Sequence, residues 1–359
     1  MPISAVDAIT PAFQHARQQL LQPFRVGQWA KLALVGLLAG EMSAGGGCNG
    51  GNFQVPTHAG GSNRLLDIGL SNIDPALYGG LIAFLIVIGI GLVVLLLYIN
   101  SVMRFILFDS VIRKECRISE GWNRRQQPGL RYFYWQLLLI LVSIASLTIL
   151  VGIPAGFAFL MGWLKEPKEH LIPLILGGMV LFFLLLAFVI AQLVIQVMSK
   201  DFVIPQMALE DIGAIEGWRR LWPRLMGEKG AYAGYIGMKI VMAIGAAIVI
   251  GIATLILVLV IVIPMGGFGA VAIIAGKAAG LTWNLYTISL AVIVGCIALF
   301  VLIYAISLVS VPAIVFFPAY SIYFFASRYP LLSALLYPPP PAPPAPPTPP
   351  LAPTPQPSG

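Results

Sequence analysis

Two short clusters of charged and aromatic residues are the clearest candidates for chemistry in this sequence. Each contains the triplet Glu-Gly-Trp, and the second triplet begins 96 residues after the first. In each cluster a glutamate stands four residues before an arginine, the favoured order for an ion pair on a helix. A tryptophan beside arginines suits the headgroup layer of a membrane, where guanidinium groups meet phosphate. The residues are Glu120, Trp122, Arg124, Glu216, Trp218 and Arg220.

These clusters have two interpretations. In the first, they belong to interfacial helices that anchor and brace the protein at the membrane surface. In the second, they line one shared groove on the cytoplasmic side that binds a lipid headgroup or a partner protein. Both require a helix, and the recurrence of Ile212, Ile215, Trp218 and Trp222 every three or four residues indicates one.

The sequence carries no recognisable catalytic or metal-binding motif. None of its three histidines lies in a His-Glu-x-x-His pattern, and a Gly-x-Ser-x-Gly turn and a phosphate-binding loop are also missing. The topology argued below places Cys48 outside, Cys116 inside and Cys296 within a membrane span, which excludes an intrachain disulfide and a cysteine metal site. We therefore expect no enzymatic activity, no cofactor and no bound metal.

The elements that position the clusters are membrane spans. Hydrophobic residues make up 59% of the 359 residues and charged residues only 10%, whereas soluble domains have roughly 25% charged residues. Crossing the hydrocarbon core takes about 20 apolar residues, and five stretches are long enough. These stretches are residues 77–97, 135–163, 171–198, 235–263 and 286–308.

A sixth apolar stretch, residues 26–44, is shorter and ends in Glu41 and glycines. A re-entrant or interfacial hairpin is therefore the alternative to a span. Counting it as a span puts 17 of the 21 lysines and arginines on the side of the N-terminus. Because basic segments stay in the cytoplasm, both termini are predicted there, in a multi-pass protein of the cytoplasmic membrane. The same distribution explains the net charge of +7 without a nucleic acid partner.

Charged residues are missing from the central parts of the five clearest spans. Lys239 lies near one end of its span, and we expect its ammonium group to reach the cytoplasmic interface. Because charges at mid-bilayer are costly and mark transport pathways, their absence argues against a proton-coupled pump. It leaves open an uncoupled pathway for a lipid or a small apolar solute.

The two clusters lie within an internal repeat. The first copy has Arg104–Asp109 and then Ile118–Arg125, and the second has Asp201–Pro205 and then Ala214–Arg220. A fainter third copy, which matches the second at a constant offset of 107, comprises residues 311–312, 322–325 and 329–330. We predict three units, each of two spans followed by a cytoplasmic amphipathic helix. Since each unit returns to the same side, the repeats are parallel and not inverted.

The two ends of the chain differ from the transmembrane domain predicted at 26–330. Residues 1–25 are expected to contain an amphipathic helix that lies on the cytoplasmic leaflet. Residues 331–359 are proline-rich, with 13 prolines among the last 22 residues, and predict a disordered, extended cytoplasmic tail. Such a tail is a spacer or a weak docking segment for a protein partner. Within the transmembrane domain, residues 45–62 form a predicted glycine-rich outer loop.

Several segments resemble known prokaryotic membrane proteins. The opening is similar to that of a group of uncharacterised prokaryotic membrane proteins, through residues 11–13, 20–25, 27–32 and 45–53. Phe202–Glu210, leading into Ile215–Trp218, resembles the membrane domain attached to some glycerophosphodiester phosphodiesterases. The resemblance implies a multi-span membrane domain of unassigned activity. No segment is long enough for the soluble phosphodiesterase domain, so that activity is not implied.

Together these observations predict an all-α polytopic transmembrane helix bundle of about six spans. We expect a non-enzymatic membrane module that binds membrane lipids or protein partners through its cytoplasmic interfacial helices. The contact residues would be Glu120, Trp122, Arg124, Glu216, Trp218 and Arg220. The alternative is a transporter or permease-like protein for a lipid or a small apolar solute.

Overall fold

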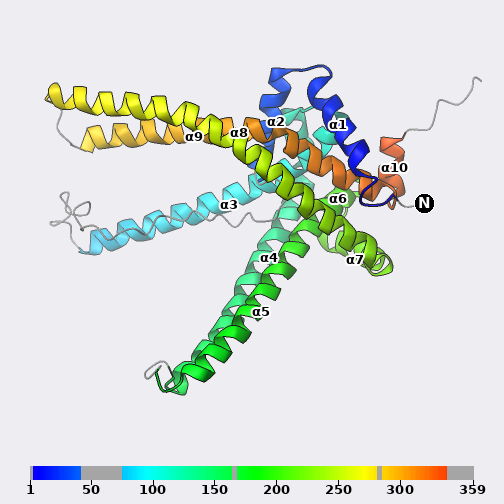
Figure 1. Cartoon of the computed structure of the whole chain (residues 1–359), viewed down its shortest axis with the longest axis horizontal. Coiled ribbons are helices and arrows are strands. Elements are labelled where there is room, and N and C mark those ends of the chain that lie inside the picture. Colours follow the sequence, from blue (N-terminus) through cyan, green and yellow to red (C-terminus); the bar gives the residue numbers. More distant parts are fainter. Residues whose placement is uncertain (1–2, 42–74, 164–167, 281–284, 338–359) are drawn as a thin grey trace, which may run out of the picture.

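The structure, a computed structural model, describes residues 3–41, 75–163, 168–280 and 285–337 (Figure 1). These ranges are almost entirely helical and contain no β-strand, which confirms the all-α class. The predicted glycine-rich loop and residues 338–359 of the tail lie outside them. The elements are α1 (Ile9–Leu21), α2 (Val26–Leu38), α3 (Pro75–Arg113), α4 (Ile118–Leu160), α5 (Leu171–Met198), the π-helical η2 (Ser199–Val203), α6 (Ile204–Glu210), α7 (Ala214–Gly227), α8 (Lys229–Ala278), α9 (Leu285–Ala326) and α10 (Pro330–Leu336).

Five helices, α3, α4, α5, α8 and α9, are long and apolar enough to cross a membrane. They contain four of the five clearest spans predicted from the sequence and most of the fifth, residues 135–163, since α4 ends at Leu160. Almost none of the side chains in their most apolar windows is buried, and hydrocarbon is the environment in which such apolar surfaces are stable. The described residues therefore have the character of a multi-pass membrane protein. Its orientation and the identity of the membrane stay predictions.

The sixth predicted span corresponds to α2, which has only 13 residues. At 1.5 Å per residue this helix is about 20 Å long, whereas the hydrocarbon core is about 30 Å thick. Instead α2 packs against α9. The Ser307 Oγ donates to the carbonyl of Ala33 at 2.7 Å, and a Cβ on Gly36 would lie only 2.6 Å from the Ile314 side chain. The count of six spans is therefore not confirmed, and the re-entrant alternative stays open.

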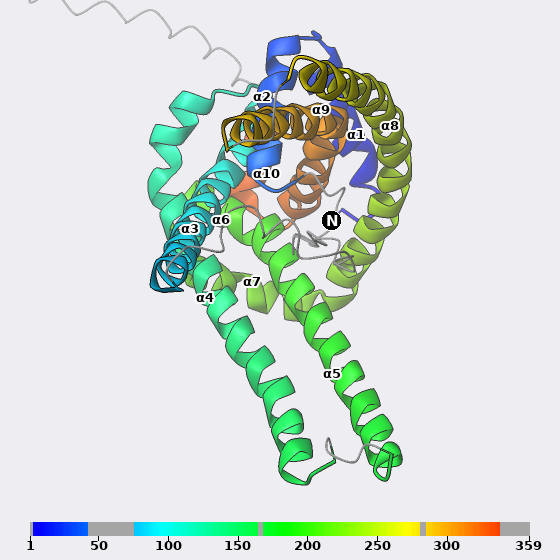
Figure 2. The ribbon, with the colours of Figure 1, turned by 90° about the vertical axis from the view of Figure 1, so that its left-hand side faces the viewer.

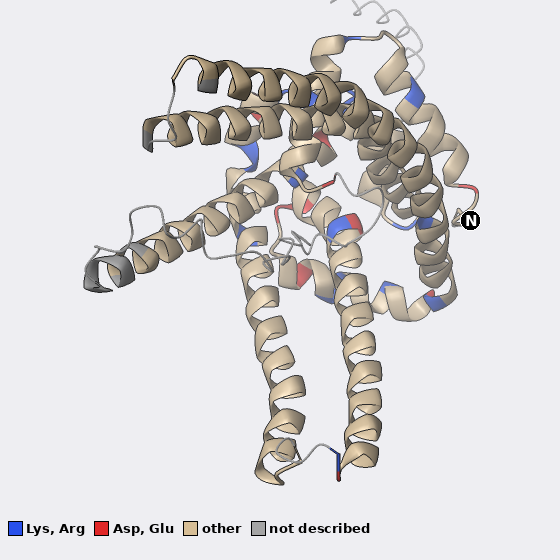
Figure 3. Cartoon of the chain, turned by 60° about the vertical axis from the view of Figure 1, so that its left-hand side comes forward, with Lys and Arg blue, Asp and Glu red and all other residues tan. Residues whose placement is uncertain are grey.

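The long helices form three arms: α3, the α4–α5 pair and the α8–α9 pair (Figures 1 and 2). The arms converge on one packed region, which we call the hub. The hub contains α1, α2, α6, α7, α10 and the inner ends of the long helices, and its buried residues concentrate in 102–111, 198–208 and 311–326. Charged residues gather there, whereas the arms are almost free of them (Figure 3). Polar chemistry is thus concentrated at one end of the arms.

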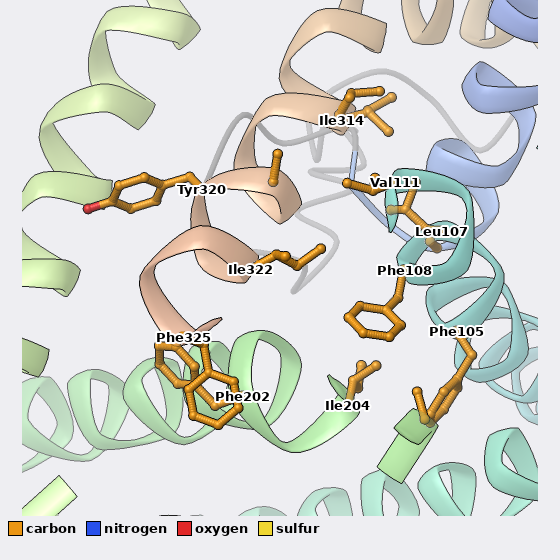
Figure 4. Close-up of a cluster of buried hydrophobic side chains, with 14 of the residues drawn as sticks. Phe105, Leu107, Phe108, Val111, Phe202, Ile204, Ile314, Tyr320, Ile322 and Phe325 are labelled. Carbon is orange, nitrogen blue, oxygen red and sulfur yellow. The ribbon is translucent and has the colours of Figure 1, made fainter. Parts of the chain in front are cut away.

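Buried aliphatic and aromatic side chains, among them Phe202 and Phe325, pack together in the hub (Figure 4). The ring of Phe202 lies 5.1 to 6.0 Å, centroid to centroid, from the rings of Tyr232, Tyr235, Phe324 and Phe325. Aromatic pairs at this spacing stabilise a core by about 0.5–1.5 kcal/mol beyond the area they bury. These contacts join η2, α8 and α9, and so fix the bases of two arms to each other.

Both Glu-Gly-Trp triplets use their glycine in the same way. A Cβ on Gly121 would lie 3.2 Å from the Ile106 side chain, and a Cβ on Gly217 would lie 2.8 Å from that of Val203. Each glycine therefore lets its helix approach the end of the preceding span closely. This similarity agrees with the first two copies of the repeat, but a repeat of three units stays a prediction.

The predicted amphipathic helices differ from one copy to the next. In the second copy α7 is a separate helix, since it ends at Gly227 and glycine is a common helix terminator. In the first copy the segment is the opening part of α4, which continues through Pro128 into the arm. In the third, residues 322–325 lie within α9. Within the described residues the amphipathic segment is a separate helix only in the second copy.

The terminal segments of the described chain pack on the hub. One face of α1 is buried, with Ala12 fully inaccessible to solvent and His15 only 4% exposed. Residues 330–336 form α10, in which Leu332 is also fully buried. The ordered part of the chain therefore extends beyond the boundary predicted at residue 330, because the first apolar residues of the tail pack on the hub.

Candidate functional site

The first predicted cluster lies at the start of α4. Trp122 is half-buried, and its ring lies edge-on to that of Tyr98 with centroids 6.1 Å apart. Glu120 is exposed and pairs with Arg117 at 3.3 Å. The expected pair between Glu120 and Arg124 is not formed, because Arg117, three residues earlier, occupies the glutamate. Arg124 is exposed and makes no ion pair with a described residue.

A neighbouring arginine, missed in the sequence, makes the stronger contacts. Arg125 is 7% exposed and binds Asp109 through two parallel hydrogen bonds, each 2.7 Å long. It also donates to the carbonyl of Ala208 at 2.7 Å. Such fork-to-carboxylate pairs are geometrically specific, so this arginine joins α3, α4 and α6 within the hub.

The second predicted cluster lies on α7. The Arg220 Nε donates to Glu216 at 3.0 Å, which confirms the expected helical ion pair. The Trp218 indole N–H donates to the Ser199 Oγ at 3.0 Å, and its ring lies 6.4 Å from that of Trp135. This tryptophan therefore holds α7 against the base of the α4–α5 arm.

Within the described ranges, no hydrogen bond, ion pair or ring contact joins the first cluster to the second. Both tryptophans pack against the hub, which agrees with the bracing interpretation. A groove shared by the two clusters stays a prediction. A different set of residues lines a cleft between α3, α4 and α5.

A cleft opens between α3, α4 and α5 where these arms leave the hub. It encloses about 530 Å³, within the range of roughly 300–1,000 Å³ typical of small-molecule sites. We call it the α3–α4–α5 cleft. Its lining residues are Val93, Leu96, Leu97, Asn100, Arg104, Tyr132, Gln136, Leu139, Ile140, Ser143, Ile144, Gln192, Gln196 and Ser199. Most of the polar residues come from the hub end of each helix, and the aliphatic residues extend outward along the arms.

Arg104 supplies the only positive charge among the lining residues. Its guanidinium donates to the carbonyl of Ala39 at 3.3 Å and to the Tyr132 hydroxyl at 3.1 Å. It forms no ion pair with a described carboxylate. A guanidinium has five N–H donors, so further donors remain for an anion in the cleft.

Several amides accompany this charge. Asn100 donates to the carbonyl of Leu38 at 3.0 Å, and Gln136 accepts from the Ser101 Oγ at 2.6 Å. Gln192 and Gln196, one helical turn apart on α5, have no hydrogen-bond partner among the described residues. A polar group left unpaired in an apolar environment costs about 1–3 kcal/mol, so these two amides are suited to a polar ligand or to water.

One buried ion pair and one partly buried ion pair involve the residues that follow Ser199, a lining residue of the cleft, and sequence reasoning missed both. Lys239 and Asp201 are 4% and 3% exposed and form a salt bridge, while the Tyr235 hydroxyl donates to Asp201 at 2.9 Å. Lys200 pairs with Glu41 at the end of α2. The expectation that Lys239 reaches the membrane interface is wrong, because its ammonium turns inward to a buried carboxylate.

Chemically, the cleft is suited to binding. The described residues contain no group of three or more His, Cys, Asp or Glu that could hold a metal ion. The polar floor combines hydrogen-bond donors with one positive charge, and the walls are aliphatic. Sequence reasoning missed this combination because Arg104, Gln136 and Gln192 belong to three different helices, although polar residues near the ends of apolar stretches were a usable signal.

Comparisons with known proteins place the chain without assigning an activity. A family model described as a family of unknown function (DUF7544) matches residues 3–335. No curated protein and no solved structure matches the chain. The resemblance to the membrane domain of glycerophosphodiester phosphodiesterases therefore stays a prediction.

Proposed function

Since this chain belongs to DUF7544, a family of unknown function, we propose its role from its own structure. We propose that it binds a membrane phospholipid in the α3–α4–α5 cleft without catalysing a reaction. The phosphate would lie against Arg104, and the acyl chains would follow the aliphatic walls of the arms. This is a more specific form of the lipid-binding module expected from the sequence, at a different set of residues.

The observation that carries this proposal is the order of polarity along the cleft. Arg104 and Gln136 lie near the hub ends of α3 and α4, whereas Val93 and Ile144 lie farther out along the arms. A phospholipid has the same order, with its charged headgroup at the membrane surface and its chains toward the centre. Arginine is also well suited to phosphate because its planar fork donates two parallel hydrogen bonds.

The amides of Gln192 and Gln196 support the same ligand. They lie within the last two turns of α5 and line the same cleft as Arg104. The glycerol and ester oxygens of a phospholipid are acceptors that these amides lack within the described protein. A purely apolar solute would leave both amides unpaired, which disfavours the permease alternative for apolar substrates.

The test uses the full chain reconstituted in nanodiscs that contain equal amounts of phosphatidylglycerol and phosphatidylcholine. Native mass spectrometry after gentle release then counts the retained lipids. We expect one phospholipid per chain, and we expect the double variant Gln192→Leu/Gln196→Leu to retain it about tenfold less, since two hydrogen bonds contribute about 0.5–1.5 kcal/mol each. Gln127→Leu, an exposed glutamine on α4 outside the cleft, serves as the matched control.

Arg104 is tested separately because it also holds Ala39 and Tyr132. We expect Arg104→Lys to retain more phosphatidylglycerol than Arg104→Gln, since only the lysine variant keeps the charge. Equal lipid retention by the wild type and the double glutamine variant, with both folded, would show that the cleft is not the binding site.

A further inference from the structure

A second hollow lies on another side of the hub, between α1, α2 and the base of the α8–α9 arm. It encloses about 680 Å³ and shares no lining residue with the α3–α4–α5 cleft. We call it the α1 groove. Its lining residues are Phe13, Ala16, Arg17, Leu20, Leu21, Trp29, Gly245, Ala246, Val249, Ile250, Pro312, Ala313, Phe316 and Phe317.

The walls of the α1 groove are almost entirely apolar, and they continue into the membrane-facing surface of the arm. Val249 on α8 is 68% exposed and Phe13 on α1 is 62% exposed. The groove is hollow on its α8 side because Gly245 has no side chain, and no atom lies within 4 Å of a Cβ built there. An apolar chain can therefore pass from the bilayer into the groove without crossing a polar surface.

One charged group stands at the edge of the groove without a protein partner. Arg17 on α1 is exposed and makes no ion pair with a described carboxylate. The other lining side chains are apolar apart from the indole of Trp29. A ligand with a negative charge at one end of an apolar chain would be complementary to this arrangement.

We propose that the α1 groove holds one acyl chain of an anionic membrane phospholipid from the leaflet next to the hub. The headgroup meets Arg17, and the chain lies along α8 and α9. The charge of Arg17 is complementary to phosphate, and the continuous apolar path to the arm identifies the bilayer as the source. This proposal does not rest on the function proposed for the other cleft.

The test is photocrosslinking in vesicles. The full chain is reconstituted in phosphatidylcholine vesicles doped with phosphatidylglycerol that carries a diazirine in one acyl chain, and labelled peptides are mapped after irradiation. We expect labelling of both 13–21 and 312–317. Gly245→Phe fills the groove and should lower this labelling at least fivefold. Gly251→Phe, on the opposite face of the same helix and also in open space, should leave it unchanged.

Further variants and lipid probes distinguish other occupants of the α1 groove and test the role of the Arg17 charge. Arg17→Gln should reduce labelling by the phosphatidylglycerol probe several-fold and labelling by an equivalent phosphatidylcholine probe little. Labelling of 13–21 by a diazirine fatty acid but not by the phospholipid probe would overturn the proposal. A second copy of the chain in the groove would also overturn it. In that case phospholipid labelling would be absent, and native mass spectrometry would detect a dimer of the wild type but not of folded Gly245→Phe.

Discussion

The hub and the arms are made of the same helices, yet they meet different surroundings. Along α9 alone, Phe300 in the arm is 60% exposed, whereas Phe324 in the hub is fully buried. In the hub, aromatic rings, close glycine contacts and ion pairs join segments that are distant in the sequence. In the arms, the helices present apolar side chains outward. The hub is thus stabilised by protein contacts and the arms by their solvent, the lipid.

This difference is the reason why we propose binding sites at particular places. Arm surfaces are uniformly apolar and have no means of distinguishing one lipid from another. Hub surfaces hold buried charges and hydrogen-bonded side chains in fixed positions. Both proposed sites, the α3–α4–α5 cleft and the α1 groove, lie where an apolar arm surface meets a polar hub residue. Among the described residues, such junctions offer a polar group to a lipid headgroup beside an apolar surface for its chains.

The contrast is tested most strongly at the ion pair between Asp201 and Lys239. Asp201→Ala leaves a buried ammonium without its carboxylate, and removing one partner of a buried pair costs about 3–5 kcal/mol. By comparison, Leu184→Ala changes a 48% exposed residue on the α5 arm, and we expect a change below about 0.5 kcal/mol. The free energy of unfolding of each variant, measured in the same detergent micelles, checks this difference.

A double replacement separates the pair itself from an unpaired charge. Asp201→Leu/Lys239→Met removes both charges, and we expect it to be far more stable than Asp201→Ala, because well-packed apolar residues often replace a buried pair at little loss. If Leu184→Ala destabilised the protein as much as Asp201→Ala, the distinction between hub and arms would fail.

A smaller effect is expected where glycines allow helices to touch. A Cβ on Gly129, in α4 within the hub, would lie 2.6 Å from a Val102 side-chain carbon and 3.1 Å from its Cα. Gly129→Leu should therefore destabilise the protein by about 1–3 kcal/mol through overpacking. Gly152→Leu on the same helix, where no atom lies within 4 Å, should not. Thermal unfolding of the two variants in micelles measures the difference, and equal unfolding temperatures would contradict it.

Sequence reasoning predicted the arms much better than the hub. Long stretches without charge, such as residues 171–198, need only lipid around them, so composition is enough to predict the helix. The position of Lys239 depended on Asp201, 38 residues away, and no local pattern contains that information. The cleft was missed for the same reason, since Arg104 and Gln192 meet only after three helices converge. Trp218 was correctly placed on a helix, but which side of that helix packs depends on tertiary contacts.

The last and smallest effect concerns the attachment of α1 to the hub. His15 is 4% exposed, its Nε2 lies 2.7 Å from the Val111 carbonyl oxygen, and its Nδ1 lies 3.1 Å from the Tyr323 hydroxyl. A neutral imidazole satisfies both contacts if Nε2 donates and Nδ1 accepts. Burial lowers the pKa of His15 below its ordinary value of 6.5, and the nearby positive charge of Lys114 lowers it further, against an opposing hydrogen bond to Val111.

The sign of the pH effect follows from this lowered pKa. The unfolded chain binds a proton near pH 6.5 and the folded chain only at lower pH, so the stabilisation is complete above 6.5 and declines as the pH falls toward the folded pKa. Unfolding temperatures measured from pH 7.5 to 5 should therefore fall more for the wild type than for His15→Gln. Parallel curves for the two proteins would contradict this prediction, because they would show that the pKa of His15 is the same in the folded and the unfolded chain. A steeper fall in the wild type would instead show that the contacts of His15 with Val111 and Tyr323 make the packing of α1 on the hub sensitive to acid.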